Sequence, residues 1–251
     1  NSLNEWIKEE GYLIFVHPPG WRKPNTDKGK YMGLYELMVM KNTIQYLEIH
    51  NAKDGIKNFR CGTRYDIYVL KKVFCDDYVS EVIDEGGKKY NISFKQWNWL
   101  PNSKFNTIKK LINGKNKCKI LYSRNSYDPR KEWISKNRDD IFKYPIVHTT
   151  SKSGIRYVWS KLNTKGLFGI KKVIFGDSGI NNPVIDIDGK YGMTQHSMAI
   201  IVKNEKHANN VRNAIDSEKF KSILKSCMWS SFALDWNIFK DLNEDFYKEF
   251  I

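Results

Sequence analysis

The polar side chains best suited to recognise a ligand gather in two stretches of the second half of the chain. Residues 149–157 contain Lys152, Arg156 and Tyr157. Residues 168–202 contain Lys171, Lys172, Asp177, Ser178, Asn181, Asn182, Tyr191, Thr194, Gln195 and His196. In the major groove of DNA, Asn and Gln pair bidentately with adenine, and Arg or Lys pairs with guanine. The alternative is ordinary turn chemistry, because Asn, Asp, Ser and Gly favour turns in any case.

A basic and aromatic run precedes these stretches. It comprises Arg124, Tyr127, Arg130, Lys131, Trp133, Lys136 and Arg138. Lys and Arg side chains there can neutralise phosphates, which gives affinity without sequence information. A solvated helix face is the alternative explanation of the run.

The charge balance of the whole chain agrees with a polyanionic partner. Its 251 residues include 42 Lys and Arg against 28 Asp and Glu, a formal charge of +14. Such an excess attracts nucleic acid, an acidic membrane surface or an acidic protein. The last two have only the net charge in their favour, whereas the 8 Trp and 14 Tyr can also stack on bases. Nucleic acid is therefore the expected class of partner.

Several other classes of site do not fit. Cys61, Cys75, Cys118 and Cys227 form no C-x-x-C pair, which favours reduced thiols over a zinc site. The segment Asp186–Lys190 lacks the length and terminal Glu of a calcium loop, and no second acid-x-Lys pair completes a nuclease centre. No apolar run is long enough for a membrane span, and no signal peptide is visible. We expect a cytoplasmic protein (bacterial or viral-factory cytosol), and the start at Asn1 suggests a fragment.

The first part of the chain has the pattern of an α/β domain. Helices are predicted at residues 2–9 and 31–40, and strands at residues 12–16, 44–49 and 59–70. Tyr12–Val16 is continuously apolar, which is typical of a strand buried in a parallel sheet. The loop after it, residues 17–24, is at the strand's carboxyl end, where open α/β sheets place ligands. Residues 73–101 are β-rich with a hairpin break at Glu85–Lys88, and a helix follows at residues 102–111.

The second part has an α+β pattern. The short polar segment Gly114–Lys117 is the predicted boundary, which gives domains at residues 1–115 and 116–251. Strands are predicted at residues 119–122, 144–148 and 156–160. Residues 168–202 predict an antiparallel meander whose Asp188-Gly189 dipeptide makes a hairpin turn. Helices at residues 207–215, 217–228 and 235–242 complete the domain.

From Tyr144 onward this order of motifs resembles the target-recognition region of adenine-N6 DNA methyltransferases from type II, often fused type IIG, restriction–modification systems. The first part is similar to the closing half of the class I methyltransferase (Rossmann-like) sheet, in which a last antiparallel strand follows the sixth. The resemblance implies an enzyme that transfers a methyl group from S-adenosylmethionine to adenine in duplex DNA. It also implies an aromatic residue, Tyr65 or Tyr68, that stacks on the extruded base.

The chain departs from that family in its catalytic motifs. The family carries an Asp/Asn/Ser-Pro-Pro-aromatic tetrapeptide, whereas this chain has His17-Pro18-Pro19-Gly20-Trp21 and no G-x-G-x-x-G turn. We therefore expect the catalytic residues and most of the S-adenosylmethionine site in an upstream part or in a partner chain, and no methyl transfer by this chain alone. The alternative is a catalytically silent nucleic-acid-binding or assembly protein that keeps the fold.

Overall fold

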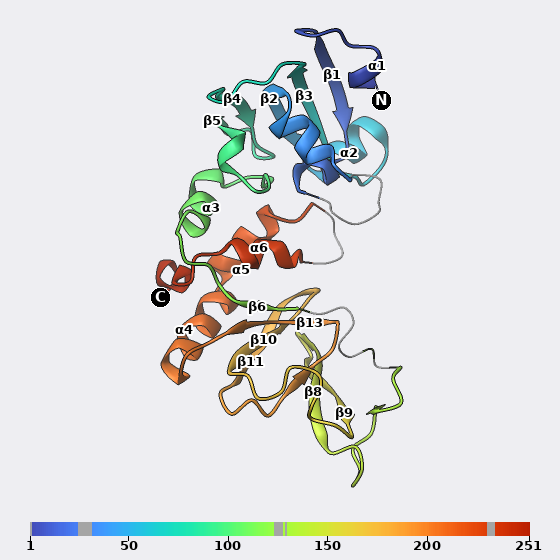
Figure 1. Ribbon diagram of the computed structural model, residues 1–251, viewed down its shortest axis with the longest axis vertical. Helices are drawn as coiled ribbons and strands as arrows, with labels where there is room; N and C mark the ends of the chain where they lie inside the picture. Colours follow the sequence, from blue (N-terminus) through green and yellow to red (C-terminus); the bar gives the residue numbers. More distant parts are fainter. Residues whose placement is uncertain (1, 25–31, 123–127, 129, 230–233) are drawn as a thin grey trace. The chain divides into compact units, whose positions relative to one another are not determined.

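The computed structural model describes residues 2–24, 32–122, 128, 130–229 and 234–251. The described residues form a mixed α and β structure with three sheets. The chain divides into two compact units (Figure 1). Unit 1 comprises residues 1–105 and 226–230, and unit 2 comprises residues 106–225 and 231–251.

The boundary predicted at Gly114–Lys117 therefore lies inside unit 2. The physical reason is hydrogen bonding to the end of the chain: the Gly114 amide donates to Asn243 Oδ1 (2.6 Å), and the Cys118 amide donates to the Leu242 carbonyl (2.8 Å). These bonds tie the expected linker to unit 2.

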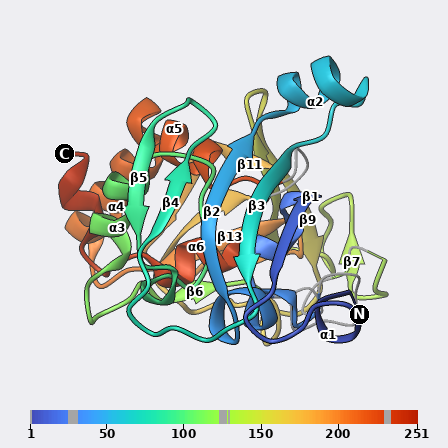
Figure 2. The ribbon, with the colours of Figure 1, turned by 90° about the horizontal axis from the view of Figure 1, so that it is seen from above.

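Unit 1 contains one five-stranded sheet (Figure 2). Its order is β1 (Tyr12–His17), β3 (Tyr65–Lys71), β2 (Thr43–His50), β4 (Ser80–Ile83) and β5 (Lys89–Ile92). β3 is antiparallel to both β1 and β2, whereas β2 and β4 are parallel. The strands predicted at residues 12–16 and 44–49 and the hairpin break between β4 and β5 are confirmed. The strand predicted at residues 59–70 begins only at Tyr65, because a helix occupies residues 52–59.

β1 corrects the expectation of a buried parallel strand. It is antiparallel to β3 and stands at the edge of the sheet. Both of its faces are open, since Ile14 is 70% exposed and Phe15 is 44% exposed. A continuous apolar run therefore does not by itself establish that a strand is buried, because burial also requires other segments to cover both faces of the strand.

The helical segments of unit 1 are short. They are α1 (Ser2–Glu5), η1 (Pro19–Arg22), the π-helix η2 (Glu36–Met40), α2 (Ala52–Phe59), η3 (Phe94–Gln96) and the start of α3 (Phe105–Ile112). The sequence patterns missed α2. It begins with a capping box between Asn51 and Asp54 and ends at Arg60 in the left-handed conformation (φ 55°), both of which define helix ends.

Unit 2 contains two four-stranded sheets. One has the order β11 (Gly179–Asp186), β10 (Lys172–Gly176), β13 (Ser197–Ile201) and β6 (Ile120–Leu121). The other has the order β12 (Gly192–Met193), β8 (Tyr144–Ser151), β9 (Gly154–Ser160) and β7 (Ile134–Ser135). The core lies between Val147 of β8 and Ile174, Val184 and Ala199 of the other sheet.

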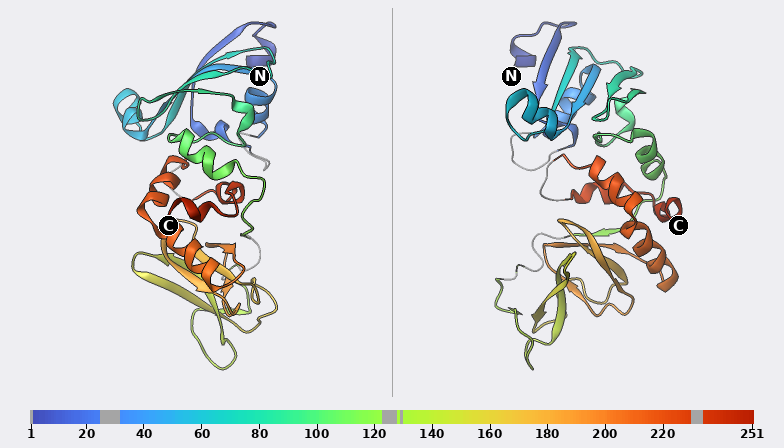
Figure 3. Two further views of the ribbon diagram at one scale, coloured as in Figure 1. Left: turned by 90° about the vertical axis from the view of Figure 1, so that its left-hand side faces the viewer. Right: turned by 180° about the vertical axis from the view of Figure 1, so that it is seen from behind.

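The predicted helices of unit 2 are confirmed as α4 (Glu205–Asp216), α5 (Glu218–Ser226) and α6 (Trp236–Asp241), followed by the short η4 (Phe246–Glu249). α4 packs against β10 and β11 (Figure 3). Asn204 caps α4 by accepting the His207 amide at 2.9 Å.

The predicted meander is antiparallel but has a different order. β10, not β11, is central, because it pairs with both β11 and β13. The Asp188-Gly189 turn does not join two paired strands, so the hairpin expectation is wrong. Asp186 instead accepts the amides of Lys190 and Tyr191, and the chain then crosses to the other sheet, where β12 runs parallel to β8.

Candidate nucleic-acid interface

Two segments that are far apart in the sequence meet at one end of unit 2. β12 pairs with β8, and the Thr194 amide then donates to the Val147 carbonyl (3.1 Å). This pairing places His196 beside His148, with ring centroids 5.1 Å apart. On the other side of β8, Thr149 is opposite Arg156 of β9. The surface formed by His148, Arg156, Gln195 and His196 is named the recognition surface below.

A β-bulge directs His148 into this surface. The β8–β9 register shifts between Val147 and Thr149, so His148 is the extra residue. Bulges of this kind re-aim a side chain out of the regular alternation of a strand. The sequence motifs missed His148, because a single His inside an apolar and Thr-rich strand carries no spacing signal.

Thr194 fixes the orientation of His148. Its Oγ1 atom donates to the His148 carbonyl (3.1 Å) and lies 3.1 Å from His148 Nδ1. A hydroxyl has one proton, so we assign the imidazole proton to Nδ1, which leaves Nε2 as an acceptor. Thr194 itself is 2% exposed. The expectation that Thr194 contacts a ligand is therefore corrected, since this residue can only position others.

The charge state of His148 follows from its neighbours. Partial burial is the largest of three causes that together lower the pKa of His148 to about 4, and the nearby charges of Arg156 and His196 are the other two. His148 is thus neutral near pH 7, its Nδ1 proton is donated to Thr194, and its Nε2 atom is left as an acceptor. Such a group can accept a hydrogen bond from the exocyclic amine of a base.

The remaining members are more accessible. His196 is exposed, with Nδ1 3.6 Å from Asp177 Oδ2. Gln195 is partly exposed and its Nε2 lies 3.5 Å from His196 Nε2. Arg156 is exposed. An amide, an imidazole and a guanidinium on one surface provide the donors and acceptors that discriminate base edges.

Two tyrosines support the recognition surface from the core side. Tyr157 and Tyr191 stack with ring centroids 5.8 Å apart and pack against the cluster that includes Val147 and Met193. Burial and the neighbouring Tyr191 raise the pKa of Tyr157, so its hydroxyl stays protonated. Both residues were predicted to touch DNA, which stays a prediction, and the structure shows that they pack against the core.

Lys152, Ser178 and Lys171 are exposed at different places. Lys152 is at the tip of the β8–β9 hairpin, which shortens the predicted polar loop to two residues. Ser178 lies in the β10–β11 turn next to Asp177, which contacts His196. Lys171 precedes β10 and so stands at the opposite end of that strand from Ser178.

Lys172 is corrected from a phosphate contact to a structural residue. Its side chain is 0% exposed, and its Nζ atom pairs with Asp186 Oδ2 at 2.6 Å. The ammonium group also donates to the Ile170 carbonyl. A buried and paired cation cannot reach a backbone phosphate in this conformation.

The basic run is only partly described, and Arg124 and Tyr127 lie outside the described residues. Arg130 is exposed and pairs with the nearby Asp128, whose pKa its hydrogen bonds lower to about 2. Lys131 lies 5.8 Å from the centroid of the Trp133 ring. The described part of the run contains turns and β7 rather than a helix.

The base-stacking candidates of unit 1 are both buried. Tyr65 is 5% exposed and stacks on His50 with ring centroids 4.4 Å apart. Tyr68 is 3% exposed and packs on Trp21 at 5.5 Å. Neither ring has a free face for an extruded base. They lie on opposite faces of β3, three residues apart, and both faces are covered there.

The His17–Trp21 loop has a structural role. Trp21 Nε1 donates to Asp66 Oδ2 (2.9 Å), and Arg22 Nε lies 3.0 Å from the same oxygen. Arg22 and Asp66 are both 0% exposed. The loop is thus anchored to β3 by a buried ion pair rather than open to a ligand.

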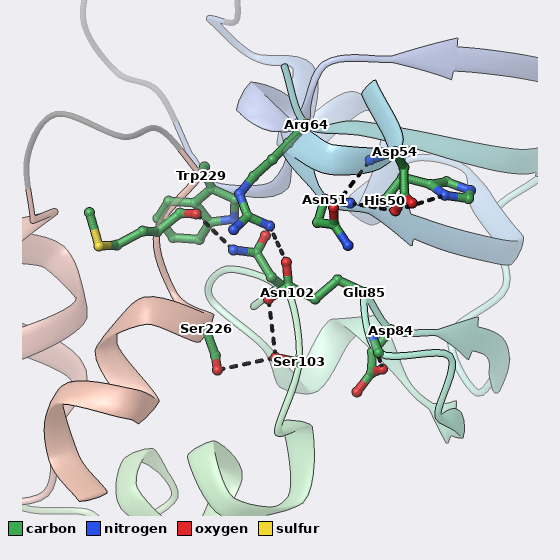
Figure 4. A network of polar contacts seen from close by, with 12 residues as sticks. His50, Asn51, Asp54, Arg64, Asp84, Glu85, Asn102, Ser103, Ser226 and Trp229 are labelled. Carbon is green, nitrogen blue, oxygen red and sulfur yellow. Dashed lines mark hydrogen bonds and ion pairs between the residues drawn. The ribbon is translucent and has the colours of Figure 1, made fainter. Parts of the chain in front are cut away.

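A second network in unit 1 joins residues 226–229 to the loop before α3 (Figure 4). Asn102 Nδ2 donates to the Met228 carbonyl (2.7 Å), and Ser103 Oγ donates to Ser226 Oγ (3.1 Å). Arg64 forms an ion pair with Glu85. These groups satisfy one another, so the network stabilises unit 1 and offers no open site.

No protein-family model matches the chain, and no curated protein matches it in sequence. Among the described residues, no group of three His, Cys, Asp or Glu side chains is arranged to hold a metal ion. In the same part of the chain no helix has the length and apolar character of a membrane span.

Proposed function

We propose that this chain binds duplex DNA and selects its sequence as part of an S-adenosylmethionine-dependent adenine-N6 DNA methyltransferase. The recognition surface is the observation that carries the proposal. Arg156, Gln195 and His196 come from different strands and connections, yet they gather with neutral His148 on one surface of unit 2. The net charge of +14 supports a polyanionic partner.

The methyltransferase assignment is supported by the sheet of unit 1. The resemblance predicts a last strand antiparallel to its neighbours, and β3 is antiparallel to both β1 and β2. The free edge and exposed apolar faces of β1 favour a further polypeptide part that covers them. In this proposal that part, on the same or a partner chain, holds the cofactor and the catalytic residues.

A catalytically silent nucleic-acid-binding or assembly protein is the second candidate. The buried Tyr65 and Tyr68 favour it to some extent, since unit 1 lacks the expected stacking ring at these positions. The two candidates differ in one observable property. Only the first predicts methyl transfer to adenine when a chain with the cofactor motifs is added.

The first experiment is fluorescence anisotropy with a random-sequence duplex across a salt series. We expect binding that weakens steeply with salt, followed by enrichment of one sequence from a randomised pool. Gln195→Ala should relax the preference at one position, whereas Gln45→Ala in β2 should leave it unchanged. Absence of duplex binding at low salt would contradict the proposal.

A further inference from the structure

A groove of about 560 Å³ lies in unit 2 beside the turn after β11. It is lined by Tyr144 and Pro145 of β8, by Phe168 and Gly169, and by Asn163, Asp188, Gly189 and Lys190. None of these residues belongs to the recognition surface. The volume is within the range of pockets that hold small ligands or single chemical groups.

The floor of the groove is aromatic. The rings of Tyr144 and Phe168 meet edge to face, with centroids 6.2 Å apart, and both are partly exposed. Phe168 also packs against the buried Ile146 and Val158. Gly192 makes room for it, since a Cβ atom there would lie 2.7 Å from the Phe168 ring. The rings are therefore held in place and present flat apolar surface to solvent, as stacking platforms do.

Two glycines at the edge of the groove leave the aromatic rings uncovered. Gly169 (φ 73°) and Gly189 (φ 69°) are both left-handed, and the Gly169 amide donates to the Gly189 carbonyl at 2.8 Å. A Cβ atom on Gly189 would lie 2.6 Å from Gly169 Cα. A larger residue would clash at Gly189 and would be strained at Gly169 by the left-handed φ, and neither glycine carries a side chain that covers the aromatic floor.

Lysines lie near the groove, and the carboxylate of Asp188 is part of its lining. Lys143 Nζ lies 5.6 Å from the centroid of the Tyr144 ring, and Lys190 pairs with Asp188 at 2.6 Å. Close by, Lys165 lies 4.6 Å from the centroid of the Trp133 ring, which packs against the same buried cluster as Phe168. An aromatic floor with cations at its margin is complementary to a base that is followed by a phosphate.

We propose that this groove binds an unpaired nucleobase of a nucleic-acid strand, with the adjoining phosphate at Lys143. The inference rests on the proposed nucleic-acid binding and adds a site for single-stranded rather than duplex substrate. Stacking on Tyr144 and Phe168 supplies affinity that tolerates any base, whereas the recognition surface discriminates paired bases.

The test uses the full chain and a fluorescein-labelled single strand of about 12 nucleotides, within the length that one binding surface covers. Tyr144→Leu keeps an apolar side chain but removes the ring, and should weaken single-strand binding at least fivefold. Duplex binding should change less than about twofold. Lys143→Gln should weaken single-strand binding and lower its salt dependence, whereas the charge-matched Lys206→Gln on α4 should have less effect.

The outcomes distinguish a failure of the groove assignment from a failure of the proposed duplex recognition. Equal losses for single strand and duplex in Tyr144→Leu, or unchanged single-strand binding, would overturn the groove assignment while duplex recognition could stand. Tight binding of a free nucleotide, measured by competition, without strand binding would overturn the assignment to a strand. If circular dichroism shows that Tyr144→Leu does not fold, the comparison of Lys143→Gln with Lys206→Gln tests the groove assignment instead, because both lysines are exposed.

Discussion

The Oγ1 atom of Thr194 lies 3.1 Å from both Nδ1 and the carbonyl oxygen of His148, although the two residues are 46 positions apart. One buried hydroxyl thus sets the tautomer and the direction of a ring at the recognition surface.

Replacement of this hydroxyl is the most direct test of the surface. Thr194→Val preserves shape but leaves the His148 carbonyl and Nδ1 without their partner. We expect a stability loss of about 1–2 kcal/mol in urea unfolding. Duplex binding should weaken roughly threefold to tenfold. Thr194→Ser should retain both properties, and equal behaviour of the two variants would contradict the positioning role.

Arg156 and Arg130 form a matched pair, since both are exposed but only Arg156 belongs to the recognition surface. Arg156→Ala should either lower the salt slope of duplex binding by about 0.9, if the residue contacts a phosphate, or relax specificity at one base pair. Arg130→Ala should have little effect on either the salt slope or the sequence specificity, because Arg130 already pairs with Asp128. Anisotropy across a salt series distinguishes the outcomes, and a larger effect at Arg130 would count against this assignment.

Lys172 and Lys171 are adjacent in sequence but differ in environment. Lys172→Met leaves the buried carboxylate of Asp186 without its cation and should cost roughly 3–5 kcal/mol of unfolding free energy. Lys171→Met should change stability by no more than about 0.5 kcal/mol, because Lys171 is exposed. Thermal or urea unfolding of both variants measures the difference. Similar stabilities would show that the Lys172–Asp186 pair is not formed.

His148 predicts a dependence of stability on pH. Its pKa is lowered to about 4 in the folded chain, against roughly 6.5 in an unfolded chain. Between these values the unfolded state binds the proton and the folded state does not, so stability is lost as the pH falls through this window. For a partly exposed ring we expect a loss of about 1–2 kcal/mol. His148→Gln should reduce the change in unfolding free energy with pH in this window, measured by urea unfolding. If the wild-type chain and the variant show the same pH dependence, the lowered pKa of His148 is refuted.

The apolar edge strand predicts self-association of the chain on its own. Ile14 and Val16 are 70% and 48% exposed, and they share one face of β1. Ile14→Lys with Val16→Lys should shift size-exclusion light scattering toward monomer, with little loss of stability. If the wild-type chain stays monomeric at high concentration, the edge does not behave as an open binding surface.

Strand and helix positions followed well from local patterns, because apolar periodicity and caps act over a few residues. The helices near residues 207–242 and the strands near Lys172 and Ser197 are examples. Pairing partners were harder to predict. Nothing near Asp188-Gly189 indicates that the next strand joins β8 rather than β11, since that choice depends on contacts with residues far away in the sequence.

The sequence patterns also did not predict which of the candidate side chains are buried. Lys172 and Lys171 are indistinguishable in type and neighbours, yet only one meets Asp186 across the strand pair Lys172↔Asp186. Tyr65 and Tyr68 were plausible stacking residues from their spacing, but packing on His50 and Trp21 covers them. His148 was missed, because its role depends on a bulge that only the paired strands reveal.

The parallel pairing of β12 with β8 has a kinetic consequence. Its two residue pairs, Gly192 with Ile146 and Met193 with Val147, close a long loop for very few backbone hydrogen bonds. The entropy of closing such a loop is lost before the contact is made. We therefore expect these pairs to form late in the folding of unit 2 and to open early, together with the recognition surface that they hold in place.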